Sequence, residues 1–301
     1  MSATSRKIAF LLNPVSGTGL KAGVLKLIEA KTFEKGIPFE FFHTNREGHY
    51  PELEKKIQDK TITDIVVMGG DGSISQVSGA LRHTGVPFGI IPMGSGNGLA
   101  LAAGIPKNPA KALEIIFSGH ASPIDAFFIN GHFSCMLSGI GFDAKVAHEF
   151  AQRPERGLWT YIKVSARNFF AAKPYPFQII CQGHDVNTEA FFVSIANSNQ
   201  FGNQFTIAPK ARLNDGLIDV VIVQKMNKFQ LLLAILHQLR FGDVQEKMFR
   251  KHSILYFQAA ELTILNPSLA PLHIDGDPAE TADRFKISVV PSAFNLIQSP
   301  H

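Results

Sequence analysis

The stretch Ile65-Val66-Val67-Met68-Gly69-Gly70-Asp71-Gly72-Ser73 decides the fold class of this chain. Four apolar residues without polar alternation predict a short strand that is buried on both faces. Glycines then surround one acidic residue, and residues 74–81 follow with a helical pattern. Strands buried on both faces are typical of parallel sheets covered by helices, so this segment predicts an α/β domain.

The same order of strand and helix recurs on both sides of that segment. Apolar runs predict strands at residues 8–12, 39–42, 65–68 and 88–91, and helical patterns occur at residues 21–31, 52–58 and 74–81. This order predicts a parallel α/β domain over residues 1–124. In such domains the functional site lies in the loops at the carboxyl ends of the strands.

The pattern changes after about residue 125, where strands predominate. Strands are predicted at residues 126–129, 133–137, 177–181, 190–196, 218–223, 262–265 and 285–290, with two helical interruptions at 158–172 and 228–241. Short strands in this number favour an antiparallel sandwich. We therefore expect a second domain over residues 125–301, the last residues of which could return to the first domain.

Composition narrows the classes of function. The 301 residues are 45% hydrophobic and 18% charged, with a net charge of +4 and no dense basic patch, which argues against nucleic acid as a partner. Two cysteines make no disulfide framework, and no signal peptide or zinc-like spacing is visible. No apolar run approaches the roughly 20 residues of a membrane-spanning helix. We expect a cytoplasmic protein whose membrane contact, if any, is peripheral.

Three successive turns between a strand and a helix are rich in small residues. They are Asn13-Pro14-Val15-Ser16-Gly17-Thr18-Gly19, Gly69-Gly70-Asp71-Gly72-Ser73 and Gly94-Ser95-Gly96-Asn97-Gly98. Glycine lets backbone amides approach a phosphate closely, and a carboxylate such as Asp71 can bind Mg²⁺. The first turn lacks the ending of a P-loop, and Asp71 could instead cap the next helix. Because all three turns share one sheet edge, we favour a polyphosphate site.

In order, these turns resemble the nucleotide motifs of the diacylglycerol kinase and sphingosine kinase family. The resemblance continues with Ala208-Pro209, with Leu213-Asn214-Asp215-Gly216-Leu217-Ile218-Asp219, and with His273-Ile274-Asp275-Gly276-Asp277 where the family has Asp-Gly-Glu. It implies a Rossmann-like α/β domain, similar to NAD kinases and phosphofructokinases, joined to an antiparallel β-sandwich with the active site in the interdomain cleft. The implied activity is ATP-dependent phosphorylation of a lipid hydroxyl.

The resemblance also implies roles for individual residues. ATP and Mg²⁺ would be needed, with Asp71 near the phosphate-bound Mg²⁺. The residues expected to contact the nucleotide are Asn13, Pro14, Gly17, Thr44, Gly69, Gly70, Asp71, Gly72, Ser73, Gly94, Ser95 and Asn97.

Acidic residues of the second domain are the candidates for the general base and for a structural Mg²⁺ site. Asp277 stands where the family usually has a glutamate that acts as general base, and Asp275 could share that role. The alternative for this segment is a β-turn at a hairpin. Asp215, with the carbonyl groups of Arg212 and Leu217, would hold a structural Mg²⁺ by resemblance, although Asp215-Gly216 could equally be a hairpin turn.

The lipid partner is less clearly marked. Residues 158–172 place aromatic residues at helical spacing beside Lys163 and Arg167, so this helix could dock on anionic lipid or simply pack into a core. The turn at residues 94–100 looks closer to sphingosine kinases. Edge strands could pair two copies into a homodimer. Two alternatives stay open: an NAD kinase that acts on a soluble dinucleotide, and a nucleotide- or lipid-binding regulator without turnover.

Overall fold

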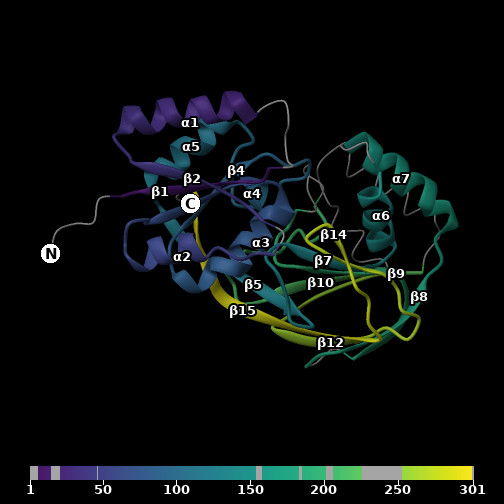
Figure 1. Ribbon diagram of the computed structural model, residues 1–301. Coiled ribbons are helices and arrows are strands. Elements are labelled where there is room, and N and C mark those ends of the chain that lie inside the picture. Colours follow the sequence, from purple (N-terminus) through teal and green to yellow (C-terminus); the bar gives the residue numbers. More distant parts are fainter. Residues whose placement is uncertain are drawn as a thin grey trace. The chain divides into compact units, whose positions relative to one another are not determined.

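The computed structural model describes residues 6–14, 21–45, 47–153, 158–182, 185–200, 206–225 and 253–299. The chain divides into two compact units (Figure 1). Unit 1 comprises residues 1–124 and 292–301, and unit 2 comprises residues 125–291.

A parallel sheet forms the centre of unit 1. Its strands are β1 (Ile8–Leu12), β2 (Phe39–His43), β3 (Asp64–Gly69) and β4 (Phe88–Pro92), in the order β4-β3-β1-β2. Every residue of β1, β3 and β4 is buried, as expected for strands that are covered on both faces. The end of β15 (Arg284–Ile297) pairs parallel to β4 through Leu296 and Phe88. The predicted parallel α/β fold is therefore confirmed.

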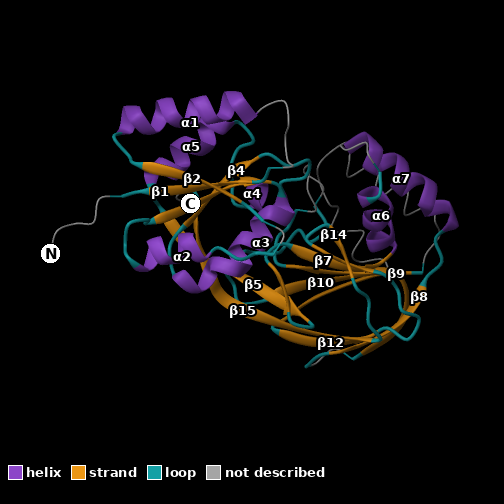
Figure 2. Cartoon of the chain, in the orientation of Figure 1, coloured by secondary structure: helices purple, strands orange, loops and turns teal. Residues whose placement is uncertain are grey.

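Helices cover both faces of this sheet (Figure 2). On one face lie α1 (Lys21–Lys35) and α5 (Pro109–Ser118), and on the other lie α2 (Pro51–Gln58) and α3 (Asp71–Leu81). A 3₁₀ helix (Arg82–Thr84) follows α3, and α4 (Gly98–Ala102) follows β4. Three of these helices lie where the sequence predicts helices, whereas α5 and α4 were not predicted.

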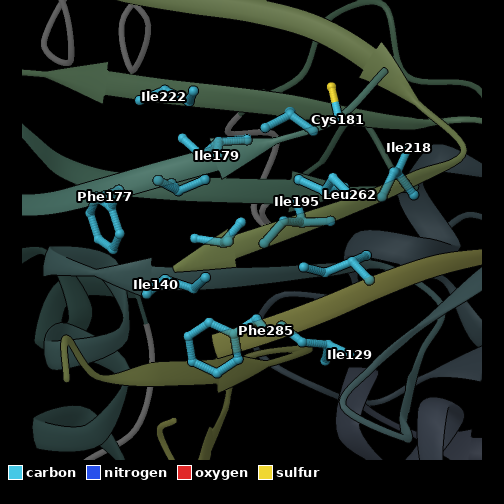
Figure 3. Close-up of a cluster of buried hydrophobic side chains, with 14 of the residues drawn as sticks. Ile129, Ile140, Phe177, Ile179, Cys181, Ile195, Ile218, Ile222, Leu262 and Phe285 are labelled. Carbon is cyan, nitrogen blue, oxygen red and sulfur yellow. The ribbon is translucent and has the colours of Figure 1, made fainter. Parts of the chain in front are cut away.

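Unit 2 is an antiparallel β structure, as predicted. Its strands are β5 (Ala121–Ile129), β6 (His132–Ser134), β7 (Leu137–Gly141), β8 (Tyr175–Ile180), β9 (Val186–Ala196), β10 (Ile218–Gln224), β11 (Ile254–Ala259), β12 (Glu261–Leu265), β13 (Leu272–Ile274), β14 (Asp277–Ala279) and most of β15. One path runs β14-β13-β7-β9-β8-β12-β15, and β10 pairs with β9 and β11. Inward-facing apolar residues such as Ile140, Ile195, Ile222 and Phe285 form its core (Figure 3).

Two helices cover the opposite face of the strands β7, β9 and β10. They are α6 (Phe142–Ala151) and α7 (Leu158–Ala171), which lie side by side. Phe169 of α7 packs with Leu137 and Phe191 in a second cluster on this face. Helix α6 was not predicted, because it begins directly after β7 at Gly141 without a polar capping residue. The predicted helix at residues 228–241 lies outside the described residues.

Two other expectations for unit 2 need correction. The single strand predicted at residues 133–137 is two strands, β6 and β7, separated by Cys135 and Met136. The alternative that Asp215-Gly216 is a hairpin turn is wrong, because residues 206–217 contain no strand and β10 pairs with β9 and β11 instead. Asp215 and Gly216 still lie in a turn, with Gly216 at a φ of 75°.

Candidate active site

The residues expected to bind nucleotide gather at one edge of the sheet in unit 1. The neighbouring strands β1, β3 and β4 end together, since Leu12 pairs with Met68 and Gly69 pairs with Pro92. Thr44 follows β2 at the same edge, is buried, and donates its amide to the carbonyl of Leu12 over 2.9 Å. The structure thus brings the carboxyl ends of four parallel strands, with the described residues that follow them, to one edge.

The turn after β3 leads directly into helix α3. Gly70 is the N-cap residue, with φ −95° and ψ −174°, and its position offers no side-chain cap for the first amides of the helix. Asp71 is the first helical residue rather than the cap. Asn13, after β1, donates its side-chain amide to the hydroxyl of Ser73 over 2.7 Å. An uncapped helix N-terminus attracts anions, so this end of α3 suits a phosphate group.

Glycine is required here for packing as well as for any ligand. A Cβ at Gly94 would lie 2.5 Å from the Cα of Gly70, and one at Gly69 would lie 2.7 Å from the Cβ of Ser73. The amide of Met93 donates to the carbonyl of Gly69 over 2.9 Å. The turns after β3 and β4 are therefore in backbone-to-backbone contact, and glycine alone permits it.

Asn97 braces the turn after β4. It has a left-handed backbone, with φ 56° and ψ 45°, and is only 2% exposed. Its side-chain oxygen accepts from the amide of Gly94 over 2.8 Å, and its side-chain nitrogen donates to the carbonyl of Gly94 over 2.7 Å. The side chain of Asn97 thus shapes the loop, while Ser95 and, after β1, Pro14 are exposed. Gly17 lies outside the described residues.

The acidic segment of unit 2 is a two-residue hairpin turn between β13 and β14. Ile274 pairs with Asp277, and the residues between them, Asp275 and Gly276, have φ values of 50° and 87°. Two consecutive positive φ values are the mark of the tight turns preferred in β-hairpins. The hairpin interpretation of this segment is confirmed, and it places Asp277 at the first position of an edge strand.

The two aspartates of this turn have different surroundings. Asp275 is buried, and its carboxylate accepts hydrogen bonds from the hydroxyl of Ser134 (2.7 Å) and from the amides of Cys135, Met136 and Leu137 (3.2, 3.1 and 3.0 Å). Asp277 is exposed. Asp275 thus anchors the link between β6 and β7, whereas Asp277 is an exposed residue at the start of β14.

Carboxylates also gather at the turn that contains Asp215. Asp125 accepts from the amide of Gly216 over 2.7 Å, and Gln258 donates to both Asp215 (3.3 Å) and Asp219 (3.2 Å). Burial raises the pKa of the Asp219 carboxyl, and the nearby charge of Asp215 adds to this rise. No three acidic, histidine or cysteine side chains in the described ranges converge as a metal cluster. A cation here would need main-chain carbonyl oxygens as well.

Comparisons with known proteins cover most of both units. Residues 7–129 match the diacylglycerol kinase catalytic domain, and residues 137–298 match the YegS C-terminal NAD kinase beta sandwich-like domain. The chain belongs to the diacylglycerol kinase family of lipid kinases. Its two halves thus match the nucleotide domain and the sandwich domain of that family, which accounts for the order of motifs along the sequence.

Individual relatives of this lipid kinase are distant but extensive. A Shewanella frigidimarina protein named "Probable lipid kinase YegS-like" is 26% identical over 79% of this chain and 77% of its own length. A diacylglycerol kinase of Staphylococcus carnosus is 25% identical over 90% of this chain and 89% of its own. The crystal structure of a diacylglycerol kinase from Bacillus anthracis str. Sterne has a TM-score of 0.74 at 20% identity, covering 98% of this chain and 97% of that one. The fold is therefore shared throughout.

Membership of the family settles the class of reaction. The protein is an ATP-dependent lipid kinase, and the interpretations as an NAD kinase or as a regulator without turnover are not favoured. None of the described helices is long and apolar enough to cross a membrane.

Sequence reasoning missed the buried residues that support the hairpin. Ser134 accompanies Asp275, and Asp143 and His273 form a close buried pair. His273 belongs to the segment that contains Asp275 and Asp277, but no role was predicted for its side chain. Asp143 opens a helix that lacks a recognisable start, so no local signal marked it.

Gly94→Ala tests whether the contact between the two turns supports nucleotide binding. The added methyl group would meet the backbone of Gly70 at 2.5 Å, so the turns must separate. Because displacements of about 1 Å can cost about 100-fold in rate, we expect KM for ATP to rise about tenfold or more. Gly23→Ala in α1, where nothing lies within 4 Å of the new Cβ, is the matched control. Unchanged ATP binding in the Gly94 variant would contradict the assignment.

Proposed function

We propose that this lipid kinase transfers the γ-phosphate of ATP to the free hydroxyl of diacylglycerol, with Asp277 as the general base. The observation that carries the proposal is the hairpin, which exposes Asp277 while Asp275 is held by four hydrogen bonds. The name of the Staphylococcus carnosus relative supports diacylglycerol as the acceptor. A sphingoid base is the second candidate, supported by the likeness of the turn at residues 94–100 to sphingosine kinases.

The turns of unit 1 are proposed to hold the polyphosphate of ATP. Backbone amides at the uncapped start of α3, from Gly70 to Ser73, are the natural donors to phosphate oxygens. The contact between Asn13 and Ser73 fixes the first turn against the second. The proposed nucleotide-binding set is completed by Pro14, Gly17, Thr44, Gly69, Gly94, Ser95 and Asn97. Of these, Thr44 and Asn97 act through the loop backbone that they support.

The proposed step uses Asp277 as a proton acceptor. Its carboxylate takes the proton of the lipid hydroxyl as that oxygen forms a bond to the γ-phosphorus and the bond to the bridging oxygen of ADP breaks. Aspartate is one methylene shorter than the glutamate usual in the family. The backbone position of the hairpin must therefore supply the reach that the shorter side chain lacks.

Two Mg²⁺ sites are proposed, and the residues present fit them chemically. Asp71, at the start of α3, would hold an ion on the phosphates, where Mg²⁺ neutralises the charge that develops during transfer. Asp215, with the carbonyl oxygens of Arg212 and Leu217, would hold a structural ion. The amide of Leu217 donates to Oδ1 of Asp215 over 3.1 Å, which holds this carboxylate in the turn.

Mg²⁺ is expected to raise the melting temperature of the nucleotide-free protein, and Asp215→Ala is expected to abolish that rise. At a concentration about 100 times Kd, binding stabilises by about 2.7 kcal/mol, or roughly 5–10 °C for a unit of this size. Thermal unfolding with and without Mg²⁺ measures the effect. Asp283→Ala, which removes an exposed carboxylate elsewhere in unit 2, should keep the full shift. An equal shift in both variants would rule out the site at Asp215.

Access to a lipid substrate suggests a peripheral membrane contact at the cytoplasmic face. Lys163 and Arg167 are exposed one turn apart on α7, while Val164 and Phe169 of the same helix are buried. Such a basic helix face is suited to anionic headgroups. We also propose that two copies of the chain can pair through an edge strand such as β2 to form a homodimer.

The deciding experiment offers several acceptors in parallel. Purified protein, γ-labelled ATP and Mg²⁺ are incubated with mixed micelles that contain diacylglycerol, monoacylglycerol, ceramide or sphingosine, with NAD as a soluble control. Label on diacylglycerol supports the proposal, and label on sphingosine moves the assignment to a sphingoid base. Label on NAD alone, or ATP binding without transfer to any acceptor, would overturn it.

A further inference from the structure

A buried histidine lies directly next to the turn that carries Asp277. His273, in β13, is fully buried, and its Nδ1 accepts a hydrogen bond from the amide of Gly276 over 3.3 Å. Its Nε2 lies 3.4 Å from Oδ2 of Asp143, which is only 6% exposed. The ring of His273 thus links Asp143 of helix α6 to Gly276 of the hairpin turn, which follows His273 by three residues.

These contacts determine which ring nitrogen carries the proton. A backbone N–H can only donate, so Nδ1 must offer its lone pair to Gly276, and the proton of a neutral ring sits on Nε2. Oδ2 of Asp143 receives no well-aligned hydrogen bond from the described residues, and this N–H lies 3.4 Å from it. Since a buried carboxylate oxygen without a donor is costly, the carboxylate favours that tautomer.

Gly139 provides the space in which the pair meets. It lies opposite His273 on the neighbouring strand β7. A Cβ at Gly139 would lie 1.8 Å from Oδ2 of Asp143 and 2.5 Å from Nε2 of His273. The absence of a side chain at this position is therefore a condition for the contact between the two residues.

Helix α6 holds the same strand at a second point. The Nε2 of His148 lies 2.7 Å from the carbonyl oxygen of Leu272, which precedes His273. A carbonyl oxygen accepts, so this nitrogen of His148 donates. One helix therefore fixes β13 through its backbone at Leu272 and through the side chain at His273.

We infer that His273 is a positioning residue for phosphate transfer: its ring fixes the amide of Gly276 and hence the backbone of Asp277, and Asp143 favours the tautomer in which the ring can do so. This inference rests on the proposed role of Asp277 as general base. Gly276 has a φ of 87° and directly precedes Asp277, the side chain of which is exposed. The backbone therefore sets the place of the carboxylate, and a displacement of about 1 Å in a reacting group can cost about 100-fold in rate.

Two substitutions of His273 separate its two contacts. In His273→Asn the side-chain oxygen can replace Nδ1 as the acceptor for Gly276, but the group that faces Asp143 is lost. In His273→Gln the longer side chain can keep a donor to Asp143, but it has no acceptor near Gly276. We expect kcat to fall at most about threefold in the asparagine variant and about 10- to 100-fold in the glutamine variant, with KM for ATP unchanged in both.

A second measurement does not depend on activity. In ¹⁵N-labelled protein, the imidazole nitrogens of His273 should report a neutral ring protonated at Nε2, and the amide of Gly276 should exchange slowly with solvent. That protection should persist in His273→Asn and disappear in His273→Gln. Melting temperatures of both variants identify any general loss of folding.

The outcomes distinguish the inference from the proposed function. If the wild type transfers no phosphate to any lipid, the proposed function fails, while the exchange of the Gly276 amide still tests the positioning. If the wild type is active and both variants lose kcat equally, or neither does, the inference is wrong. A ring protonated at Nδ1, or equal exchange of Gly276 in the two variants, would also overturn it.

Discussion

Replacing Asp277 with asparagine is expected to lower kcat for lipid phosphorylation by about 10²- to 10⁴-fold, the usual contribution of a general base. The amide keeps the size of the side chain but cannot accept the proton of the lipid hydroxyl. KM for ATP should not change, because the proposed nucleotide residues all lie in unit 1. Asp277 is exposed, so the free energy of unfolding should stay within about 0.5 kcal/mol of the wild type.

Two further variants, at Asp277 and just after the hairpin, sharpen this test. Asp277→Glu restores the residue usual in the family and keeps the carboxylate, so it should lose less kcat than Asp277→Asn even where the longer side chain displaces that carboxylate. Glu280→Gln removes another exposed carboxylate nearby and should leave kcat unchanged. Steady-state kinetics on the labelled lipid measure all three. Full activity in Asp277→Asn would exclude this residue as the base.

The nucleotide half of the fold could be predicted because its signals are local. Each buried strand of unit 1 is a continuous apolar run, and the glycines that follow mark the turn at its end. Parallel pairing then brings those turns to one edge without further information. The sequence could not show that Gly70 and Gly94 are in contact with each other. This contact is a second reason, besides phosphate binding, why both positions are glycine.

Unit 2, which contains the hairpin, depends on contacts between residues far apart in the sequence, and its structure was predicted less well. Residues 133–137 have the apolar character of one strand, yet the carboxylate of Asp275, 138 or more residues away, draws three consecutive amides to itself and breaks the strand in two. The pairing of Asp143 with His273 was missed for the same reason. A local pattern contains no record of a partner that far along the chain.

Asp275→Ala is expected to lower the free energy of unfolding by about 3–5 kcal/mol, the largest loss of stability that we predict. The substitution leaves three buried amides and the hydroxyl of Ser134 without their acceptor. It also places alanine at a φ of 50°, a conformation that aspartate and asparagine tolerate better. Denaturant unfolding followed by circular dichroism measures the change. Ser134→Ala, which removes one donor, should cost only about 1 kcal/mol.

Asp275→Asn distinguishes an anchor from a catalytic group. Oδ1 accepts from Ser134, Met136 and Leu137, whereas Oδ2 accepts from Cys135, so an asparagine that keeps its oxygen at Oδ1 turns its NH₂ group toward the amide of Cys135. We therefore expect a loss of stability of about 1–3 kcal/mol, between those of the serine and alanine variants. Activity should fall only as far as the hairpin shifts Asp277. If Asp275 were itself the base, the same variant would lose kcat by about 10²-fold or more, whereas Asp277→Asn would keep it.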